Sequence, residues 1–265
     1  MPQTGWQRRA ERAEELALRH TFAADVLRFY SVIAKFQAKL SEQLSKQTAS
    51  PSEERPLSGG ALPPPLQNSF DDFLAVLQDH APAPVLERTQ DLKDSPGEVK
   101  VALLTNFWSG THPQRQSIDE FLARAFLQPY AEFVRQRVTP AAEKHTSTLC
   151  PFCGRRPGVG VLRPLGEGGL RSLVCSFCLY EWPFRRILCP GCGEEEHHKL
   201  PVFTAAALPH VRVEGCDSCK TYIKTVDLTR NGLAEPVVDE IAAIPLDLWA
   251  QERGYAKLQA NLMQM

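Results

Sequence analysis

Eight cysteines, all within the 70 residues from position 150 to 219, restrict the fold of this chain more than any other sequence feature. A CxxC turn brings two thiolates onto one tetrahedral metal ion. Cysteines of a secreted disulfide scaffold are usually dispersed along a short chain, so this clustering favours reduced, metal-binding thiols. The four CxxC pairs are Cys150 with Cys153, Cys175 with Cys178, Cys189 with Cys192, and Cys216 with Cys219.

The spacing of the pairs predicts how they combine. The first and second pairs are separated by 21 residues, the second and third by 10, and the third and fourth by 23. This pattern is typical of two consecutive ribbons, each closed by its own two pairs. Each half also begins with CPxCG and ends with a CxxC pair followed closely by a tyrosine, Tyr180 or Tyr222. We therefore expect the first pair to share a metal ion with the second, and the third with the fourth.

The chemistry of four thiolates allows more than one metal. Gly154 and Gly193 tolerate the backbone angles that turn main-chain N–H groups toward sulfur. Because each ribbon is too small to bury a core, metal should supply its stability, and structural zinc sites in peptides contribute roughly 10–16 kcal/mol. The sequence predicts two metal ions per chain, either structural zinc or rubredoxin-like iron. A thioredoxin-like dithiol is disfavoured, because it needs one exposed CxxC in a βαβ setting.

Several charged residues flank the cysteines. A divalent ion with four thiolates carries a charge of about −2, which nearby arginines could offset. Alternatively, these arginines form a partner-binding edge or are solvated surface residues. Histidines are surplus, because four thiolates complete each tetrahedral site. The residues concerned are Arg155, Arg156, Arg185, Arg186, His197, His198 and His210.

Residues 1–145 are expected to form a helical domain. Apolar residues recur at helical spacing over 8–44, with basic residues on the opposite face. A stretch rich in Pro, Ser and Gly over 47–66 has no such period and predicts a connecting loop inside the domain. Ser69 is the predicted start of the next helix, which should end near two prolines at 82 and 84.

The rest of this domain also favours helices. A short helix is predicted over 85–91, and the apolar run over 99–107 is assigned to a helix because its neighbours are helical. Ser117 and Glu120 form a capping-box pattern before a long apolar face. That face continues past Pro129, where we expect a kink.

Beyond residue 145 the periodicity changes to short β-rich runs separated by Gly and Pro. The predicted parts are a first four-cysteine module over 146–186, a second over 187–230, and a helical tail over 231–265. The fold class is therefore α+β: a helical N-terminal domain, two tandem rubredoxin-like or zinc-ribbon modules, and a C-terminal helix. Strands are expected over 172–174, 187–188, 211–213 and 222–226, and the tail helix over 237–248 with an extension over 249–255.

Composition excludes several classes of function. The formal net charge is −1 and the pI is near 6.7, so no global positive field is present to hold nucleic acid. No stretch of about 18 apolar residues occurs, which argues against membrane insertion and predicts a cytoplasmic protein. The common nucleotide-binding, hydrolase and protease motifs are missing, and we expect no catalytic activity.

The cysteine block resembles the FdhE family, the formate dehydrogenase accessory proteins. The resemblance is carried by CPFCGRRP, CSFCLYEWPFRRILCPGCG and VEGCDSCKTYIKTVDLT, and more loosely by the tail EPVVDEIAAIPLDLWAQERGY. It implies a helical domain, two rubredoxin-like modules, and iron held by the eight cysteines. It further implies a cytoplasmic factor that binds the catalytic subunit of a respiratory formate dehydrogenase before export and is required for that enzyme's activity.

Two other functions are compatible with such ribbons. One is a rubredoxin-like electron carrier, in which iron would cycle between Fe(II) and Fe(III) near the surface. The other is a zinc-ribbon nucleic-acid adapter, against which the near-zero charge argues. A helical face with spare apolar residues would also allow self-association.

Overall fold

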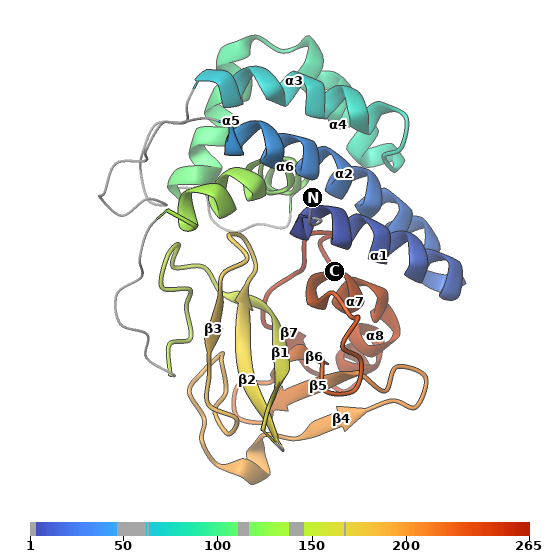
Figure 1. Cartoon of the computed structure of the whole chain (residues 1–265), viewed down its shortest axis with the longest axis vertical. Coiled ribbons are helices and arrows are strands. Elements are labelled where there is room, and N and C mark those ends of the chain that lie inside the picture. The colour runs from blue at the N-terminus through green and yellow to red at the C-terminus, as the bar shows by residue number, and fades with distance from the viewer. Residues whose placement is uncertain (1–3, 47–61, 63, 111–116, 138–145, 167) are drawn as a thin grey trace.

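The computed structural model describes residues 4–46, 62, 64–110, 117–137, 146–166 and 168–265. Most of the predicted loop over 47–66 therefore lies outside the described residues. Helices α1 to α6 form one half of the molecule, and a seven-stranded sheet with helices α7 and α8 forms the other (Figure 1). This arrangement confirms the predicted α+β class.

The helical pattern over 8–44 is confirmed, but the structure divides it into two helices. Thr4 caps the first helix through a capping box with Gln7, and the helix ends at His20, whose backbone is not helical. The turn that follows contains neither Gly nor Pro, so the sequence carried no breaker to mark it. The elements are α1 (Gly5–Arg19), a 3-10 turn (Thr21–Ala23) and α2 (Ala24–Ser45).

Four more helices complete this half, and all four were expected from the sequence. They are α3 (Pro64–Gln78), α4 (Ala83–Asp94), α5 (Gly97–Ser109) and α6 (Ile118–Arg135). The predicted start at Ser69 is wrong, because α3 begins at Pro64, where the first helical turn needs no N–H donor. The assignment of 99–107 to a helix is confirmed by α5.

The start of α6 follows its sequence signal. The Ser117 hydroxyl accepts a hydrogen bond from the Glu120 backbone N–H at 3.1 Å, which caps the helix. Pro129 lies inside α6, which continues to Arg135. None of the described helices is both long and apolar enough to cross a membrane.

Phenylalanines from three helices make the core of the helical half. The ring centroids of Phe70 and Phe126 lie 5.0 Å apart, and those of Phe36 and Phe73 lie 5.1 Å apart. Phe70, Phe73 and Phe126 are completely buried. Burial of such side chains stabilises a fold by roughly 1.5–3 kcal/mol each, so this cluster holds α2, α3 and α6 together.

The two cysteine modules share one sheet. Strand β1 pairs antiparallel with β2 and parallel with β6, so the first module joins the second edge to edge in the order β3-β2-β1-β6-β5-β4. Gly160 of β1 lies opposite Thr225 of β6, and a side chain at Gly160 would collide with the Thr225 hydroxyl. The strands are β1 (Pro157–Leu165), β2 (Gly168–Cys175), β3 (Glu181–Pro183), β4 (Val202–Thr204), β5 (Val211–Cys216), β6 (Thr221–Asp227) and β7 (Ala256–Lys257).

The strand predictions have a mixed outcome. Those over 172–174, 211–213 and 222–226 are confirmed by β2, β5 and β6. The prediction over 187–188 is wrong, because these residues form a bend that leads into the third CxxC pair.

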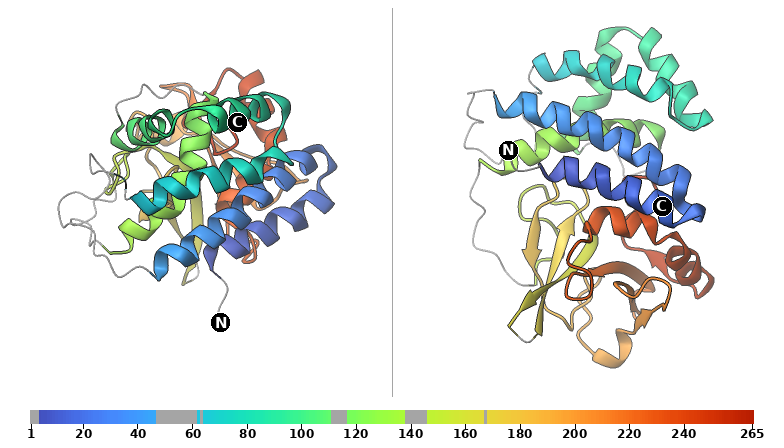
Figure 2. Two further views of the ribbon diagram at one scale, coloured as in Figure 1. Left: turned by 90° about the horizontal axis from the view of Figure 1, so that it is seen from above. Right: turned by 45° about the vertical axis from the view of Figure 1, so that its right-hand side comes forward.

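The C-terminal tail contacts both halves of the molecule. The single helix predicted over 237–248 is two helices, α7 (Pro236–Ala242) and α8 (Ile244–Glu252), divided at Ala243. Pro245 lacks an N–H donor and cannot continue α7, but it fits the first turn of α8. Figure 2 (right) shows α7 between α1 and the sheet, and β7 then pairs with β6.

Candidate metal centres

All four CxxC turns share one backbone feature. The residue directly after each second cysteine is left-handed, with φ of 67° at Gly154, 57° at Leu179, 79° at Gly193 and 54° at Lys220. The sequence predicted this conformation only at the two glycines. Leu179 and Lys220 adopt it although side chains disfavour it, so the internal repeat extends to the backbone of the turns.

These turns direct main-chain donors at sulfur. The N–H of Phe177 lies 3.3 Å from Cys175 Sγ, and the N–H of Gly191 lies 3.3 Å from Cys189 Sγ. Such hydrogen bonds favour the thiolate form, which is the form that binds metal.

The structure brings the eight sulfurs together in two groups, and each group is made of the two CxxC pairs that the sequence predicted to combine. In each group all four sulfur atoms lie within 4.8 Å of one another. We call them the first group and the second group. The first group is Cys150, Cys153, Cys175 and Cys178, and the second group is Cys189, Cys192, Cys216 and Cys219.

The dimensions of both groups fit a tetrahedral ion. In the first group Cys150 and Cys178 are 3.5 Å apart, sulfur to sulfur, and Cys153 and Cys175 are 3.3 Å apart. In the second group the corresponding separations are 3.8 and 3.7 Å. Metal–sulfur bonds of about 2.3 Å at tetrahedral angles require sulfur separations of about 3.8 Å. Zinc and iron fit this donor set equally well.

The first group favours one thiolate before any metal binds. Burial raises the pKa of Cys175, but hydrogen bonds from the thiols of Cys150, Cys153 and Cys178 outweigh it and hold that pKa well below its usual range. Hydrogen bonds with Cys150 and Cys175 raise the pKa of Cys153 well above its usual range. These contacts thus favour the thiolate form at Cys175, the form that binds metal.

The second group behaves similarly at Cys219. Burial opposes ionisation there, but hydrogen bonds from the Thr221 hydroxyl and backbone lower the pKa of Cys219 to about 7. The Thr221 hydroxyl lies 3.0 Å from the Cys219 sulfur.

The first group is packed against the helical half. Phe177, inside the second CxxC pair, meets Phe107 of α5 edge to face with ring centroids 5.1 Å apart. The Arg155 guanidinium lies 4.0 Å from the Phe107 ring centre and donates to the Phe107 carbonyl at 2.7 Å. Of the alternatives for Arg155, the structure therefore excludes a solvated surface position.

A second arginine, Arg124 of α6, joins the same seam. Its side chain is 3 % exposed and donates to the Ser176 carbonyl at 2.8 Å and to the Asn261 carbonyl at 3.0 Å. Arg124 thus ties α6 to a CxxC turn and to the tail. No local motif marked this residue, because its partners are 52 and 137 positions away.

The other flanking arginines lie at the surface. Arg156 is exposed, Arg185 pairs with Glu195 at 2.8 Å, and Arg186 donates to the Gly169 carbonyl at 3.1 Å. For these three the surface interpretation is confirmed.

The histidines lie outside both groups, as expected. His197 and His198 are in an exposed 3-10 turn. His210, to which the sequence assigned no role, lies 2.8 Å from Asp239, and Asp239 also accepts a bidentate pair of hydrogen bonds from Arg12 of α1. This trio connects α1, α7 and the loop before β5.

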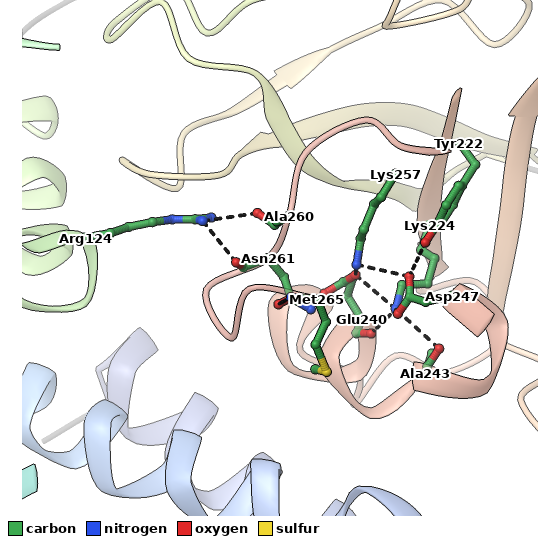
Figure 3. A network of polar contacts seen from close by, with 10 residues as sticks. All are labelled: Arg124, Tyr222, Lys224, Glu240, Ala243, Asp247, Lys257, Ala260, Asn261 and Met265. Atoms are coloured by element: carbon green, nitrogen blue, oxygen red, sulfur yellow. Dashed lines mark hydrogen bonds and ion pairs between the residues drawn. The ribbon is translucent and has the colours of Figure 1, made fainter. Parts of the chain in front are cut away.

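A buried charge network pins the tail to the sheet (Figure 3). Lys224 of β6 is fully buried and lies 2.5 Å from Asp247 of α8 and 3.0 Å from Glu240 of α7. Lys257 of β7 pairs with Glu240, and the Tyr222 hydroxyl donates to Asp247 at 2.7 Å. Burial raises the pKa of Glu240, but the charges of Lys224 and Lys257 outweigh it and lower that pKa to about 2. Sequence periodicity did not indicate this network.

The fold and the two cysteine groups define an α+β protein in which a helical half precedes two rubredoxin-like four-cysteine modules that could hold metal ions. Family models agree over nearly the whole chain: the FdhE N-terminal model matches residues 1–147, the central domain 149–186 and the C-terminal domain 187–264. The chain belongs to the FdhE family.

Individual relatives support this membership. A protein FdhE homolog from Aquifex aeolicus is 30 % identical over 200 residues, covering 75 % of this chain and 70 % of the relative. The homolog from Stutzerimonas stutzeri is 27 % identical, covering 96 % of this chain and 88 % of its own. The crystal structure of the FdhE protein from Pseudomonas aeruginosa matches with a TM-score of 0.71 at 26 % identity, covering 98 % of this chain and 95 % of that chain.

Proposed function

We propose that this chain is an accessory protein required for the formation of active respiratory formate dehydrogenase. The observation that carries the proposal is the FdhE match along residues 1–147, 149–186 and 187–264, which includes all eight cysteines. The chain binds the catalytic subunit of that enzyme in the cytoplasm, before export, and performs no catalysis itself. It thus acts on a protein and not on a metabolite, and self-association is compatible with this role.

Each cysteine group holds one iron or zinc ion in this proposal. The sulfur separations of 3.3–3.8 Å and the N–H donors directed at sulfur support such a site. The ion would cross-link two CxxC turns and so stabilise the surface presented to the enzyme. Metal analysis with a visible spectrum separates the metals, because FeS4 centres absorb visible light and bleach on reduction, whereas zinc is colourless.

The direct test is deletion of the coding gene, followed by an assay of formate oxidation in extracts. Activity should be lost and should return with the wild-type gene or with Lys39→Ala, a change at an exposed position of α2. Cys175→Ser, which breaks the first group, should not restore it. Unchanged formate oxidation in the deletion strain would rule out the accessory role.

A binding measurement tests the partner. The purified full chain should retain the catalytic subunit of formate dehydrogenase on a column, and a metal-stripped chain should retain less. Failure of the metal-loaded chain to bind the subunit would contradict the proposed partner, even if the deletion phenotype were present.

A further inference from the structure

The two cysteine groups have the same turns but different surroundings. In the first group Cys150, Cys175 and Cys178 are buried and form part of the main hydrophobic core. In the second group Cys192 is exposed and Cys219 is half-buried, and neither belongs to a hydrophobic cluster of the described residues. The second group therefore has one sulfur edge open to solvent.

The first group is also covered by the helical half. Phe107 of α5 packs on Phe177, Arg155 stacks on both rings, and Arg124 of α6 binds the Ser176 carbonyl. Three of its four cysteines are buried and Cys153 is half-buried, so a ligand has free access to an ion in this group only if the seam between helices and sheet opens. Such opening breaks buried contacts and makes exchange slow.

The turns of the second group are linked without metal. Glu194, beyond the third CxxC pair, accepts a hydrogen bond from Ser218 inside the fourth pair. Asp217 of the same turn accepts from the Tyr255 hydroxyl at 2.8 Å, and its N–H donates to the Lys199 carbonyl at 2.8 Å. These bonds can hold both turns in place while one metal–sulfur bond is broken.

Small cavities also lie beside both groups. A cavity of about 50 Å³ touches Cys189 and Cys216 of the second group, and three arginines and Glu214 line it. Arg171 and Arg212 pair with Glu214, and the lining as a whole keeps a net positive charge that favours an incoming anion. The cavity of about 30 Å³ at Cys175 is lined by α6 and the tail, inside the seam.

We infer that the second group is an exchangeable metal site, whereas the first group keeps its ion. With an ion bound, exchange would start at Cys192: an incoming thiol would bind as a thiolate in place of Cys192, and Cys192 would leave as a thiol with the proton that the incoming thiol gave up. No electron is transferred, and the charge of the four-thiolate centre is unchanged. This inference rests on the metal loading proposed above and assigns the two groups different roles within it.

The test uses the full chain loaded with zinc, with glutathione as the thiolate and a chromophoric chelator to report release. Two ions per chain should be present at the start by native mass spectrometry. The ion of the second group should leave at least about tenfold faster than the ion of the first group, because release from the first group requires opening of the seam. Far-UV circular dichroism should keep its helical signal through the fast phase.

Alkylation of the wild-type chain shows which cysteine group releases its ion in each phase, without relying on a variant. During the fast phase, N-ethylmaleimide should label Cys192 first and then the rest of the second group, while Cys150 and Cys178 stay protected. Cys192→Ser should abolish the fast phase and leave the slow one. If both groups are labelled equally, or the first group is labelled earlier, the inference about exchange is wrong, but the proposed metal loading still stands. Absence of bound zinc at the start would overturn the proposed metal loading as well.

Discussion

The helical half and the cysteine half of this molecule both bury apolar side chains, but the cysteine half adds thiols and a buried charge network. The helical half encloses phenylalanines such as Phe70 and Phe126, which are fully buried. The cysteine half encloses an apolar cluster that includes Val161 and Val226, together with the thiols and with Lys224, which is fully buried. The comparison indicates that apolar burial stabilises both halves, and we expect the cysteine half to depend in addition on metal and on complete pairing of its charges.

The seam between the halves links these two sources of stability. Arg124 and Phe107 belong to helices but contact the CxxC turn at Ser176 and Phe177. Loss of the first metal ion should therefore weaken the packing of α5 and α6, without removing the phenylalanine core behind them.

The largest effect is expected from removal of both metals. Structural zinc sites contribute roughly 10–16 kcal/mol in peptides, more than the net stability of a typical domain. A chelator should therefore abolish the cooperative unfolding of the sheet while most helical circular dichroism persists. Urea titrations followed by far-UV circular dichroism and by tryptophan fluorescence should then no longer coincide. If the two transitions still coincide after complete removal of metal, the sheet does not depend on metal more than the helices do.

Lys224→Met should give the next effect, a loss of about 3–5 kcal/mol, because it leaves the buried Asp247 and Glu240 carboxylates with one cation fewer. Urea unfolding of the metal-loaded chain measures it. Lys39→Met, a change at an exposed position of α2, serves as the control and should stay within about 0.5 kcal/mol of wild type. If Lys224→Met has the same free energy of unfolding as the wild type, the cysteine half does not depend on its charge pairing.

Leu122→Ala tests the helical half. Leu122 is 0 % exposed in α6, and truncation of such a residue costs about 2–5 kcal/mol. Leu18→Ala in α1, where the side chain is 81 % exposed, is the matched control. Both variants should retain two metal ions per chain by mass spectrometry. Loss of metal from Leu122→Ala would mean that the two halves are not separately stabilised.

Acid should act on the cysteine half through Glu240. Its pKa in the folded chain is lowered to about 2, below the value of about 4.3 for a free glutamate, so its contribution is complete above the unfolded pKa. Stability should fall as pH drops from about 4.3 toward 2, by on the order of 3 kcal/mol. Glu240→Gln should flatten this part of a stability–pH curve. If Glu240→Gln loses as much stability in acid as the wild type does, Glu240 is not the cause of the acid sensitivity.

Ser117→Ala should give the smallest effect, about 1 kcal/mol, because it removes the hydroxyl that caps α6. Ser117→Asp should restore stability, since aspartate also caps helices. Thermal unfolding of both variants distinguishes this capping role from a general surface effect.

Predictability from sequence follows the same division. Helices were recognised because apolar periodicity is a local signal, and the errors fell where local signals mislead: the turn at His20 has no breaker, and Pro64 starts a helix. The cysteine pairing was also readable, because CxxC spacing is local. Strands β1, β3 and β4 were not foreseen, and the parallel pairing of β1 with β6 joins residues 65 positions apart. Arg124 and Lys224 escaped notice for the same reason, since their partners are distant in the sequence.

Hydrogen exchange of the metal-loaded and metal-stripped full chain, read by residue, tests the central claim most directly. The account predicts that amides in β1, β2, β5 and β6 lose protection when metal is removed, whereas those in α2 and in α6 around Phe126 keep it. Sheet amides that stay protected without metal, or helices and sheet that lose protection together, would contradict it.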